Sequence, residues 1–500
     1  MDALVLAFGL VFTPDTLIVI VLASAFGLFV GAMPGLTATM AAALLVPFTF
    51  YMDPVPAIAA IISCTAMAIT AGDIPGALLR IPGTPASAAY VEDANGLTRK
   101  GKAGLAIGIS ICAAAFGGLF GFAVLMLAAP MLARFALNFS SFEYFWLSVL
   151  GLSCAVIVSR GGIAKGMLSL LLGLFIAQIG LDPLIGQPRF TFGIGELAGG
   201  ISFIPAMIGM FALAEILRNG GRGLQTAPQA ELTNPFAGVG ATLGRYRLNL
   251  LRGAAAGSVI GALPGIGGDL GAWITYSLAK RSSKTPEKFG TGHPEGLVEA
   301  GATNNAALSS SWIPAMVFGI PGDAVTAIAV GVLFMKGMEP GPQLLTVNPH
   351  NFYAVLLVFV LANLLLIPFG YAAAKAARYI FKVPPAYLNA AILLFCVVGA
   401  YAINNTMFGV LVMIVLGVLA YILQSRDFAI APIILGIVLG PLVEQSFITS
   451  MTIARGDVLG FFGRPIAAAL GAITSLIWLA MITRAIGGFQ RVRQRQTPGA

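Results

Sequence analysis

Proline followed by glycine interrupts the apolar runs of this 500-residue chain at four places, Pro34-Gly35, Pro82-Gly83, Pro264-Gly265 and Pro321-Gly322. In an apolar surrounding such a break leaves backbone groups unpaired, and it persists only where protein or a polar cavity satisfies them. The helix that resumes presents free N–H groups and the positive end of its dipole, which suits an anion. Unwound carbonyl groups suit a small cation. The breaks therefore predict a binding site for both kinds of ion.

The residues at these breaks are the first group of predicted substrate-binding residues. Hydroxyl groups at Thr37 and Thr84 either contact the ligand or cap the helix that follows. One Pro-Gly pair alone is more often a kink, but four pairs in matched positions favour a site. The predicted residues are Pro34, Gly35, Leu36, Thr37, Pro82, Gly83, Thr84, Pro264, Gly265, Ile266, Pro321 and Gly322.

Two adjacent amides, Asn304 and Asn305, lie inside the apolar run 297–320. Paired amides in a lipid-buried helix are expensive and usually functional, so we predict that they contact the substrate or the coupling ion. The alternative is a hydrogen bond to a neighbouring helix. If the coupling ion is sodium, we place it near these amides and Asp323.

Charged groups also stand beside the breaks. Arg80 is a predicted substrate-binding residue, because a guanidinium holds a carboxylate bidentately. It can equally form an ion pair with Asp73, seven residues earlier, and the sequence leaves both interpretations open. If protons are the coupling ion, the predicted relay residues are Asp73, Asp269 and Glu215.

The composition predicts the surroundings of these residues. Hydrophobic residues make up 58% of the chain and charged residues only 10%, against about 25% charged in soluble proteins. Mean hydropathy is +0.92. These values exclude a soluble fold, a disordered chain and a nucleic-acid-binding protein. We predict an all-α polytopic protein of the lipid bilayer, with roughly 11 to 15 spans of about 20 residues each.

Nothing in the sequence predicts an enzyme or a bound cofactor. The four cysteines lie in apolar runs and are interpreted as core residues. Two histidines are too few for a metal centre, and no phosphate-binding loop or nucleophile–base pair is evident. The N-terminus lacks the basic segment of a signal peptide, so the first apolar stretch is expected to remain as a helix.

Two short segments occur twice in the same order. Residues 31–36 (GAMPGL) resemble 261–266 (GALPGI), 230 residues later, and residues 80–84 (RIPGT) resemble 319–323 (GIPGD), 239 residues later. These matches predict an internal repeat. We assign 1–220 to the first transmembrane repeat, 221–244 to a cytoplasmic linker, 245–486 to the second repeat and 487–500 to a basic cytoplasmic tail.

The basic residues predict opposite orientations for the two repeats. The chain has no Lys or Arg before Arg80, which places its N-terminus outside, whereas Arg245, Arg247 and Arg252 place the start of the second repeat inside. Together these features predict an inverted-topology repeat with broken helices or re-entrant hairpins. Arg189 and Lys336 fall on the outer side and fit this topology least well.

Taken in order, the motifs resemble those of one family, the large membrane subunit of tripartite tricarboxylate transporters (TctA family). The resemblance covers residues 15 to 465. The matching segments are 31–39 (GAMPGLTAT), 81–88 (IPGTPASA), 99–104 (RKGKAG), 261–267 (GALPGIG), 288–290 (KFG), 304–306 (NNA), 319–322 (GIPG) and 340–342 (PGP).

The resemblance implies a secondary transporter of the bacterial inner membrane that imports an organic carboxylate, with a sodium or proton gradient as its driving force. It implies two partner proteins, a periplasmic substrate-binding protein and a small membrane subunit. An elevator-type movement of paired hairpins fits such an architecture, and a second copy of the chain is a further partner to consider. The alternative is a channel-like or structural subunit that carries no substrate itself.

The chain departs from the family pattern at the predicted site. Arg80 replaces the usual Asn, Asp73 replaces a usual Ser, and Asp323 stands where Ser is common. Gly301 occupies the position of a usual Glu, with Glu299 nearby. These departures favour a carboxylate other than citrate, or an Asp73–Arg80 pair in place of a neutral network.

Overall fold

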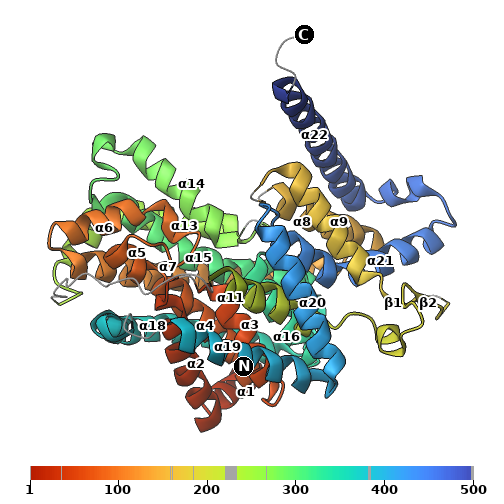
Figure 1. Ribbon diagram of the computed structural model, residues 1–500, viewed down its shortest axis with the longest axis horizontal. Helices are drawn as coiled ribbons and strands as arrows, with labels where there is room; N and C mark the ends of the chain where they lie inside the picture. The colour runs from red at the N-terminus through yellow and green to blue at the C-terminus, as the bar shows by residue number, and fades with distance from the viewer. Residues whose placement is uncertain are drawn as a thin grey trace. The chain divides into compact units, whose positions relative to one another are not determined.

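The computed structural model is almost entirely helical (Figure 1). Two residues each in β1 (Gly180–Leu181) and β2 (Pro188–Arg189) form an antiparallel pair, with Gly180 opposite Arg189. The all-α prediction is therefore confirmed for the described part of the chain. The structure describes residues 2–34, 36–157, 159, 161–183, 185–219, 234–265, 267–380 and 385–496.

The chain forms two compact units, and each takes segments from both sequence halves. The first comprises Met1–Arg134 and Ile204–Tyr421. Its elements are α1 (Asp2–Val11), α2 (Pro14–Ala32), α3 (Ala38–Thr49), α4 (Pro54–Ala71), α5 (Asp73–Leu79), η1 (Ser87–Ala89), α6 (Val91–Arg99), most of α7 (Ala103–Ala136), α10 (Phe203–Met207), the π-helix η3 (Ile208–Leu213), α11 (Ala214–Asn219), α12 (Val239–Arg245), α13 (Arg247–Gly261), α14 (Gly267–Ser282), η4 (Pro286–Lys288), α15 (Pro294–Phe318), α16 (Ala324–Met335), α17 (Pro342–Thr346), α18 (Pro349–Ile380), α19 (Pro385–Asn404) and most of α20 (Met407–Gln424).

The second unit comprises Phe135–Phe203 and Ile422–Ala500. Its elements are α8 (Ser141–Ile157), α9 (Ile163–Ala177), β1, β2, η2 (Gly195–Gly199), α21 (Ala431–Ile453), η5 (Val458–Phe462) and α22 (Pro465–Gln496). Arg189 forms ion pairs here with Asp182 and Glu444, the latter at 2.5 Å. Hydrogen bonding to Glu444 raises the pKa of Arg189 above its ordinary value.

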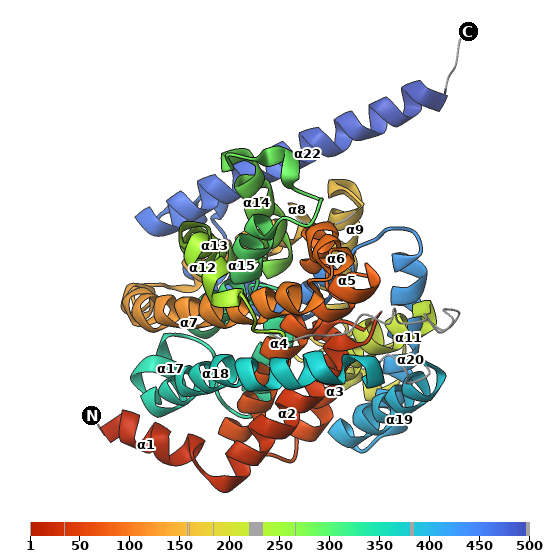
Figure 2. The same ribbon diagram turned by 90° about the vertical axis from the view of Figure 1, so that its left-hand side faces the viewer.

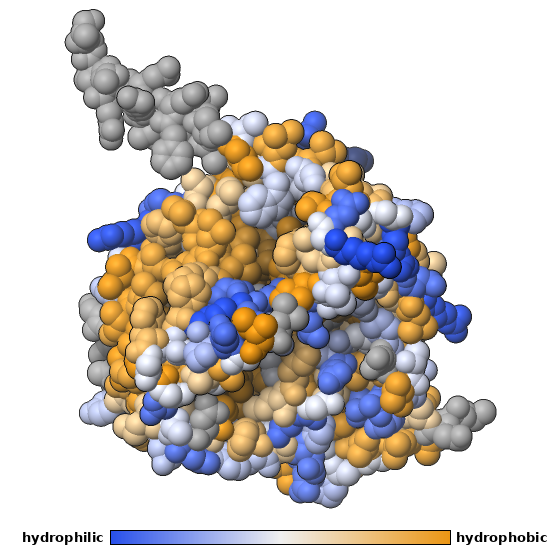
Figure 3. Space-filling model, turned by 90° about the vertical axis from the view of Figure 1, so that its right-hand side faces the viewer, coloured by the Kyte–Doolittle hydropathy of each residue, from blue (hydrophilic) through white to orange (hydrophobic). Residues whose placement is uncertain are grey.

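Within the described residues, seven helical segments are long and apolar enough to cross a membrane. They are Pro14–Ala32, Pro54–Leu79, Ala103–Ala136, Pro349–Ala377, Met407–Gln424, Ala431–Ile453 and Pro465–Thr483, and five shorter apolar helices accompany them. Large apolar side chains such as Met131 and Leu22 are exposed, and the face in Figure 3 carries wide hydrophobic areas among hydrophilic patches. Such surfaces suit lipid rather than water.

Helix α15 is the core helix of the first unit. Every residue from Gly296 to Val317 is buried, and α7, α13 and α14 pack around it. It is not among the seven segments above, because it carries polar side chains, including Asn304 and Asn305, along its length. A polar helix at the centre of an otherwise apolar unit is where a binding site is expected.

Glycines bring two equivalent helix pairs into close contact. A Cβ at Gly31 of α2 would lie 2.3 Å from the Ala68 carbonyl oxygen of α4, and one at Gly261 of α13 would lie 2.3 Å from the Ala307 carbonyl oxygen of α15. The two contacts occupy matching positions in the two halves, at the repeat spacings given above. Small residues thus set the separation of both pairs.

This packing gives a first testable prediction. We expect Gly31→Ala to destabilise the protein by about 1–3 kcal/mol, because the added methyl group cannot fit beside the Ala68 backbone. Denaturant unfolding in detergent measures the loss. Gly9→Ala is the matched control, since nothing lies within 4 Å of a Cβ there and alanine favours the helix. Equal stability of both variants would contradict this account of the contact.

Some short helices and the contacts of Lys336 were not predicted from the sequence, and parts of the predicted linker and tail are not described by the structure. Helix α1 precedes the first membrane-length helix, α2, and the short helices α5 and α6 follow α4. Lys336 donates to the carbonyl groups of Phe50 and Met52 at the end of α3, which gives this outer-side lysine a structural role. Most of the predicted linker, residues 221–233, and the last four residues of the predicted tail lie outside the described residues.

Candidate functional site

The breaks at Pro82-Gly83 and Pro321-Gly322 have the same local geometry. Each follows a helix that ends in a left-handed residue, Arg80 with φ 61° and Gly319 with φ 69°. The amide groups of these two residues donate to the carbonyls of Gly76 and Ala315, respectively, at 3.1 Å. The sequence repeat therefore corresponds to a repeated backbone conformation.

Close backbone packing explains the glycine of each pair. A Cβ at Gly83 would lie 2.6 Å from Gly72, and a Cβ at Gly322 would lie 2.8 Å from the Cβ of Ser311. Gly72 and Ser311 are themselves matching positions, 239 residues apart. The amide of Gly83 also donates to the Gly72 carbonyl at 3.0 Å. Each broken segment therefore folds back onto the helix that precedes it.

A reciprocal cap follows each of these breaks. Thr84 and Ser87 exchange two hydrogen bonds of 3.1 Å, each from a backbone amide to the other residue's hydroxyl. In the second half, the Asp323 amide donates to the Thr326 hydroxyl at 2.8 Å, and the Thr326 amide donates to Asp323 Oδ1 at 2.7 Å. The Thr84 hydroxyl thus has a local hydrogen-bond partner, and the matching cap in the second half carries a carboxylate.

The other two breaks separate α2 from α3 and α13 from α14. Thr37 caps α3, accepting a hydrogen bond from the amide of Met40 at 3.2 Å. In the second half, Gly265 and Gly267 take left-handed conformations with φ 81° and 67°. Two predicted site residues, Gly35 and Ile266, lie outside the described residues.

The start of α14 brings three breaks together. A Cβ at Gly267 would lie 2.8 Å from the Cβ of Asp323, and one at Gly268 would lie 3.4 Å from Asn304 Oδ1. Further along α14, the Trp273 indole donates to the Pro85 carbonyl at 3.1 Å. The segments after Pro264 and Pro321 thus meet beside Asn304, and the segment after Pro82 contacts the same helix at Trp273. Figure 2 shows α14 and α15 near α5 and α6. Helix α3, after Pro34, packs instead against α16.

A buried polar cluster lies at this meeting point. Asp73 accepts hydrogen bonds from the Tyr90 hydroxyl at 2.8 Å and from the Ser110 hydroxyl. Tyr90 is also hydrogen-bonded to the side chain of Asn304. Nearby, the Thr70 hydroxyl donates to Asn305 Oδ1 at 3.4 Å. The cluster joins residues of both sequence halves.

One polar atom of this cluster is left over. The Nδ2 group of Asn305 is buried and has no hydrogen-bond partner in the structure. An unpaired buried donor costs about 1–3 kcal/mol, so it marks a place where an acceptor such as a carboxylate oxygen would be stabilised. Asn305 is the predicted site residue with the clearest capacity for a ligand.

Comparison with known sequences identifies the family. Residues 17–435 match the description "Tripartite tricarboxylate transporter TctA family". The chain belongs to this family. It is 35% identical over 477 residues to an uncharacterised 52.8 kDa protein of Agrobacterium vitis from the TAR-I ttuC' 3' region, covering 94% of this chain and 93% of the relative. A second uncharacterised Agrobacterium vitis protein, from the TAR-II ttuC' 3' region, is 39% identical over 214 residues, 43% of this chain and 88% of its own length. No solved structure matches.

Family membership establishes the coarse function. The chain is a multi-pass membrane component of a tripartite tricarboxylate transporter, and its family is one of transporter components rather than enzymes. A tripartite system also implies partner proteins. The resemblance drawn from the motifs is confirmed by this match.

The charges at the TctA-family site are arranged differently from the sequence prediction. Arg80 forms its ion pair with Glu92, at 3.0 Å from Nε and 2.8 Å from Nη2, so the Asp73–Arg80 pair, one of the two interpretations left open, is wrong. The reason is the left-handed conformation of Arg80, which ends α5 and turns the side chain away from the face that bears Asp73. Both members of the Arg80–Glu92 pair are about half exposed.

The remaining predicted relay residues are in different surroundings. Asp269 of α14 interacts electrostatically with Tyr90 and so belongs to the neighbourhood of the cluster. Glu215 forms an ion pair with Arg218 on the same short helix, α11. The structure thus places Asp73 and Asp269 beside the meeting point of the breaks.

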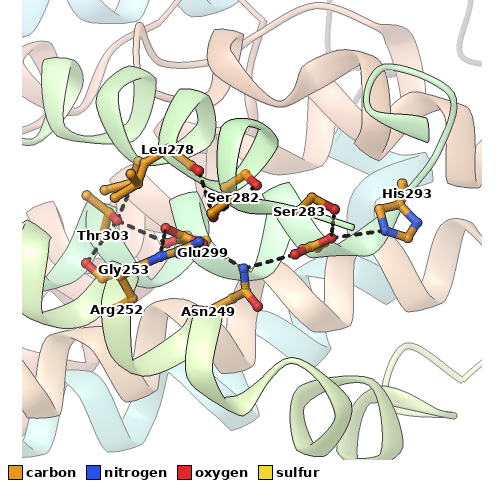
Figure 4. A network of polar contacts seen from close by, with 12 residues as sticks. Asn249, Arg252, Gly253, Leu278, Ser282, Ser283, His293, Glu299 and Thr303 are labelled. Atoms are coloured by element: carbon orange, nitrogen blue, oxygen red, sulfur yellow. Dashed lines mark hydrogen bonds and ion pairs between the residues drawn. The ribbon is translucent and has the colours of Figure 1, made fainter. Parts of the chain in front are cut away.

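A second polar network in this TctA-family chain escaped the sequence prediction. Glu299 of α15 is fully buried and is held by Arg252 of α13, through bonds of 2.7 and 2.5 Å, and by Asn249 at 2.7 Å (Figure 4). Asn249 also reaches Glu295, which accepts from Ser283 at 2.6 Å. The sequence signals were weak, since Glu299 and Arg252 are 47 positions apart and lie in different apolar runs.

Proposed function

We propose that the chain is the translocating subunit of a secondary transporter that imports an organic carboxylate. A periplasmic binding protein would deliver the substrate, a small membrane subunit would complete the complex, and a sodium or proton gradient would drive uptake across the bacterial inner membrane. The proposal is carried by the contacts of the broken segments with the start of α14 beside Asn304, whose neighbour Asn305 bears a buried, unpaired amide. A homodimer of this chain is part of the proposal.

The proposed architecture is an inverted-topology repeat. The matched helix pairs α2–α4 and α13–α15, the matched left-handed helix ends and the matched caps support the repeat. The basic residues at the start of the second half support the inversion. Alternating access in such proteins is largely a rigid movement of one repeat element against the other, and we propose an elevator-type movement of this kind.

The proposed binding roles follow from the chemistry of each group. The free amide groups at the start of α14, after Pro264-Gly265, would face the substrate carboxylate. Asn305 Nδ2 would donate to it, with Asn304 beside it. Carbonyl groups at the breaks, together with Asp323, would suit a sodium ion if sodium is the coupling ion.

The competing interpretation is a channel-like or structural subunit. A pore is typically lined by rings of like charge or by a continuous polar helix face. The polar residues near the breaks gather instead in a discrete buried cluster. This arrangement favours a carrier with a discrete site.

Uptake into proteoliposomes tests the proposal. The chain is reconstituted with its two partners, and labelled citrate, succinate and lactate are offered with imposed sodium and pH gradients. We expect uptake of at least one carboxylate, and we expect it to require the binding protein. Absence of all uptake by folded, assembled protein would favour the structural-subunit interpretation.

A variant pair tests the role of Asn305 in the same assay. We expect Asn305→Leu to lower uptake about tenfold or more, because a hydrogen bond to a charged group contributes about 1.5–3 kcal/mol. The matched control is Asn363→Leu, which removes another buried amide whose Nδ2 donates to the Phe359 carbonyl of its own helix. Equal uptake by the two variants would exclude a direct substrate contact by Asn305.

A further inference from the structure

Asp73 is a buried carboxylate whose contacts are all neutral. It lies at the start of α5 and is only 5% exposed. Its two oxygens accept hydrogen bonds from different hydroxyl groups, Oδ1 from Tyr90 and Oδ2 from Ser110. Burying a charge without an opposite charge is strongly unfavourable. Binding of a cation would therefore stabilise the buried Asp73 carboxylate.

The charged groups around Asp73 have other partners. On the side of α5 and α6, Arg80 pairs with Glu92, and Asp93 accepts from the amides of residues 290–293. On α15, Glu299 pairs with Arg252. On α14, Asp269 is near enough to interact with Tyr90 and adds a second negative charge to the neighbourhood. The groups that face Asp73 therefore favour a positive charge there.

The geometry around Asp73 suits a proton better than a metal ion. Both oxygens are already in hydrogen-bond contact with hydroxyl groups, and a hydroxyl can donate to a carboxylate or accept from a carboxylic acid. A proton can therefore bind through reorientation of one O–H group, without any movement of heavy atoms. A sodium ion would have to displace both hydroxyl hydrogens and enter between tightly packed helices.

Tyr90 connects Asp73 to the proposed substrate site. Its hydroxyl donates to Asp73 at 2.8 Å and is hydrogen-bonded to Asn304, the neighbour of Asn305. Tyr90 also directly follows η1, whose first residue, Ser87, is hydrogen-bonded to Thr84 after the Pro82-Gly83 break. A change of protonation at Asp73 thus alters a hydrogen bond that reaches both the amide pair and a broken segment.

We propose that Asp73 carries the coupling proton and that Tyr90 transmits its protonation state to Asn304. The inference rests on the proposed transport function and makes its coupling ion specific. A proton from the outside forms an O–H bond with the Asp73 carboxylate, and that bond breaks on the inside, so one proton crosses with the substrate. No other bond is made or broken.

The test separates coupled uptake from exchange. Proteoliposomes of the complex are given labelled citrate, succinate and lactate in sodium-free buffer, with an inward gradient of about one pH unit, which supports about tenfold accumulation per proton. We expect the wild type to accumulate substrate. We expect Asp73→Asn to lose accumulation but to keep exchange of internal for external substrate within about twofold, because exchange needs no net proton movement.

Glu287→Gln is the matched control, since it removes an exposed carboxylate of the same unit, and it should accumulate substrate like the wild type. Accumulation by Asp73→Asn under the pH gradient, or wild-type accumulation driven only by sodium, would overturn the inference and leave the transport proposal standing. Neither uptake nor exchange by the wild type would instead overturn the transport proposal. If Asp73→Asn does not fold, wild-type vesicles loaded with a pH-sensitive dye decide the matter, because substrate entry must acidify the lumen.

Discussion

Replacing Arg252 with alanine is expected to destabilise the protein by about 3–5 kcal/mol, the usual cost of breaking a buried ion pair from one side. Glu299 would remain fully buried with Asn249 as its main side-chain donor. Arg252 itself reaches the outside of the α13–α15 pair, so its loss leaves little cavity, and the cost reports mainly the unpaired charge. Denaturant unfolding in detergent measures the change.

Two controls identify the cause of this loss. Arg80→Ala removes one member of an exposed ion pair and should cost less than about 1 kcal/mol. The double variant Arg252→Met with Glu299→Leu removes the buried carboxylate together with its partly exposed partner and should recover most of the stability lost by Arg252→Ala. A double variant as unstable as the single one would show that the network contributes more than charge compensation.

The network also shows how the two halves of the chain differ. At the positions that match Arg252 and Glu299, the first half has Leu22, which is exposed, and Ala60, which is buried. Both helix pairs pack through glycine, so the ion pair is not needed to bring α13 and α15 together. Both helix pairs therefore share the glycine packing, and the α13–α15 pair has the Arg252–Glu299 ion pair in addition.

Much of the helical fold could be predicted from the sequence, because long apolar runs and Pro-Gly pairs are local signals. The predicted run at 297–320, for example, corresponds closely to α15. The short helices η1 and α6 could not be predicted in the same way. Their residues are neither strongly apolar nor periodic over a sufficient length, and their conformation depends on packing against α5 and α14.

The candidate site could be predicted only where residue type alone is unusual. Adjacent amides in an apolar run drew attention to Asn304 and Asn305, which do lie in the polar cluster. Tyr90 and Ser110 gave no such signal, since a tyrosine or serine near a helix end is common. The alternative Asp73–Arg80 pair failed for a definite reason, because it assumed a continuous helix where the chain takes a left-handed turn.

Asp93 of α6 connects the first half of the sequence to the second through four hydrogen bonds. Its Oδ1 accepts from the amides of Gly290, Gly292 and His293 at 2.8 to 3.0 Å, and its Oδ2 accepts from the Tyr276 hydroxyl at 2.7 Å. Burial and this hydrogen bond raise the pKa of Tyr276 above its ordinary value, so the phenol stays protonated and donates.

We expect Asp93→Ala to destabilise the protein by about 2–4 kcal/mol, because each buried donor left unpaired costs about 1–3 kcal/mol and water can reach some of them. Asp93→Asn should lose much less, since its oxygen can still accept from the three amides. Denaturant unfolding in detergent compares these variants with Glu92→Ala, which alters the neighbouring exposed side chain. The amide hydrogen-exchange rate at residues 290–293 should rise in Asp93→Ala but not in Asp93→Asn or Glu92→Ala. Unchanged protection there would mean that the loop is held by the close packing of Gly96 against Gly292, and that the carboxylate contributes little.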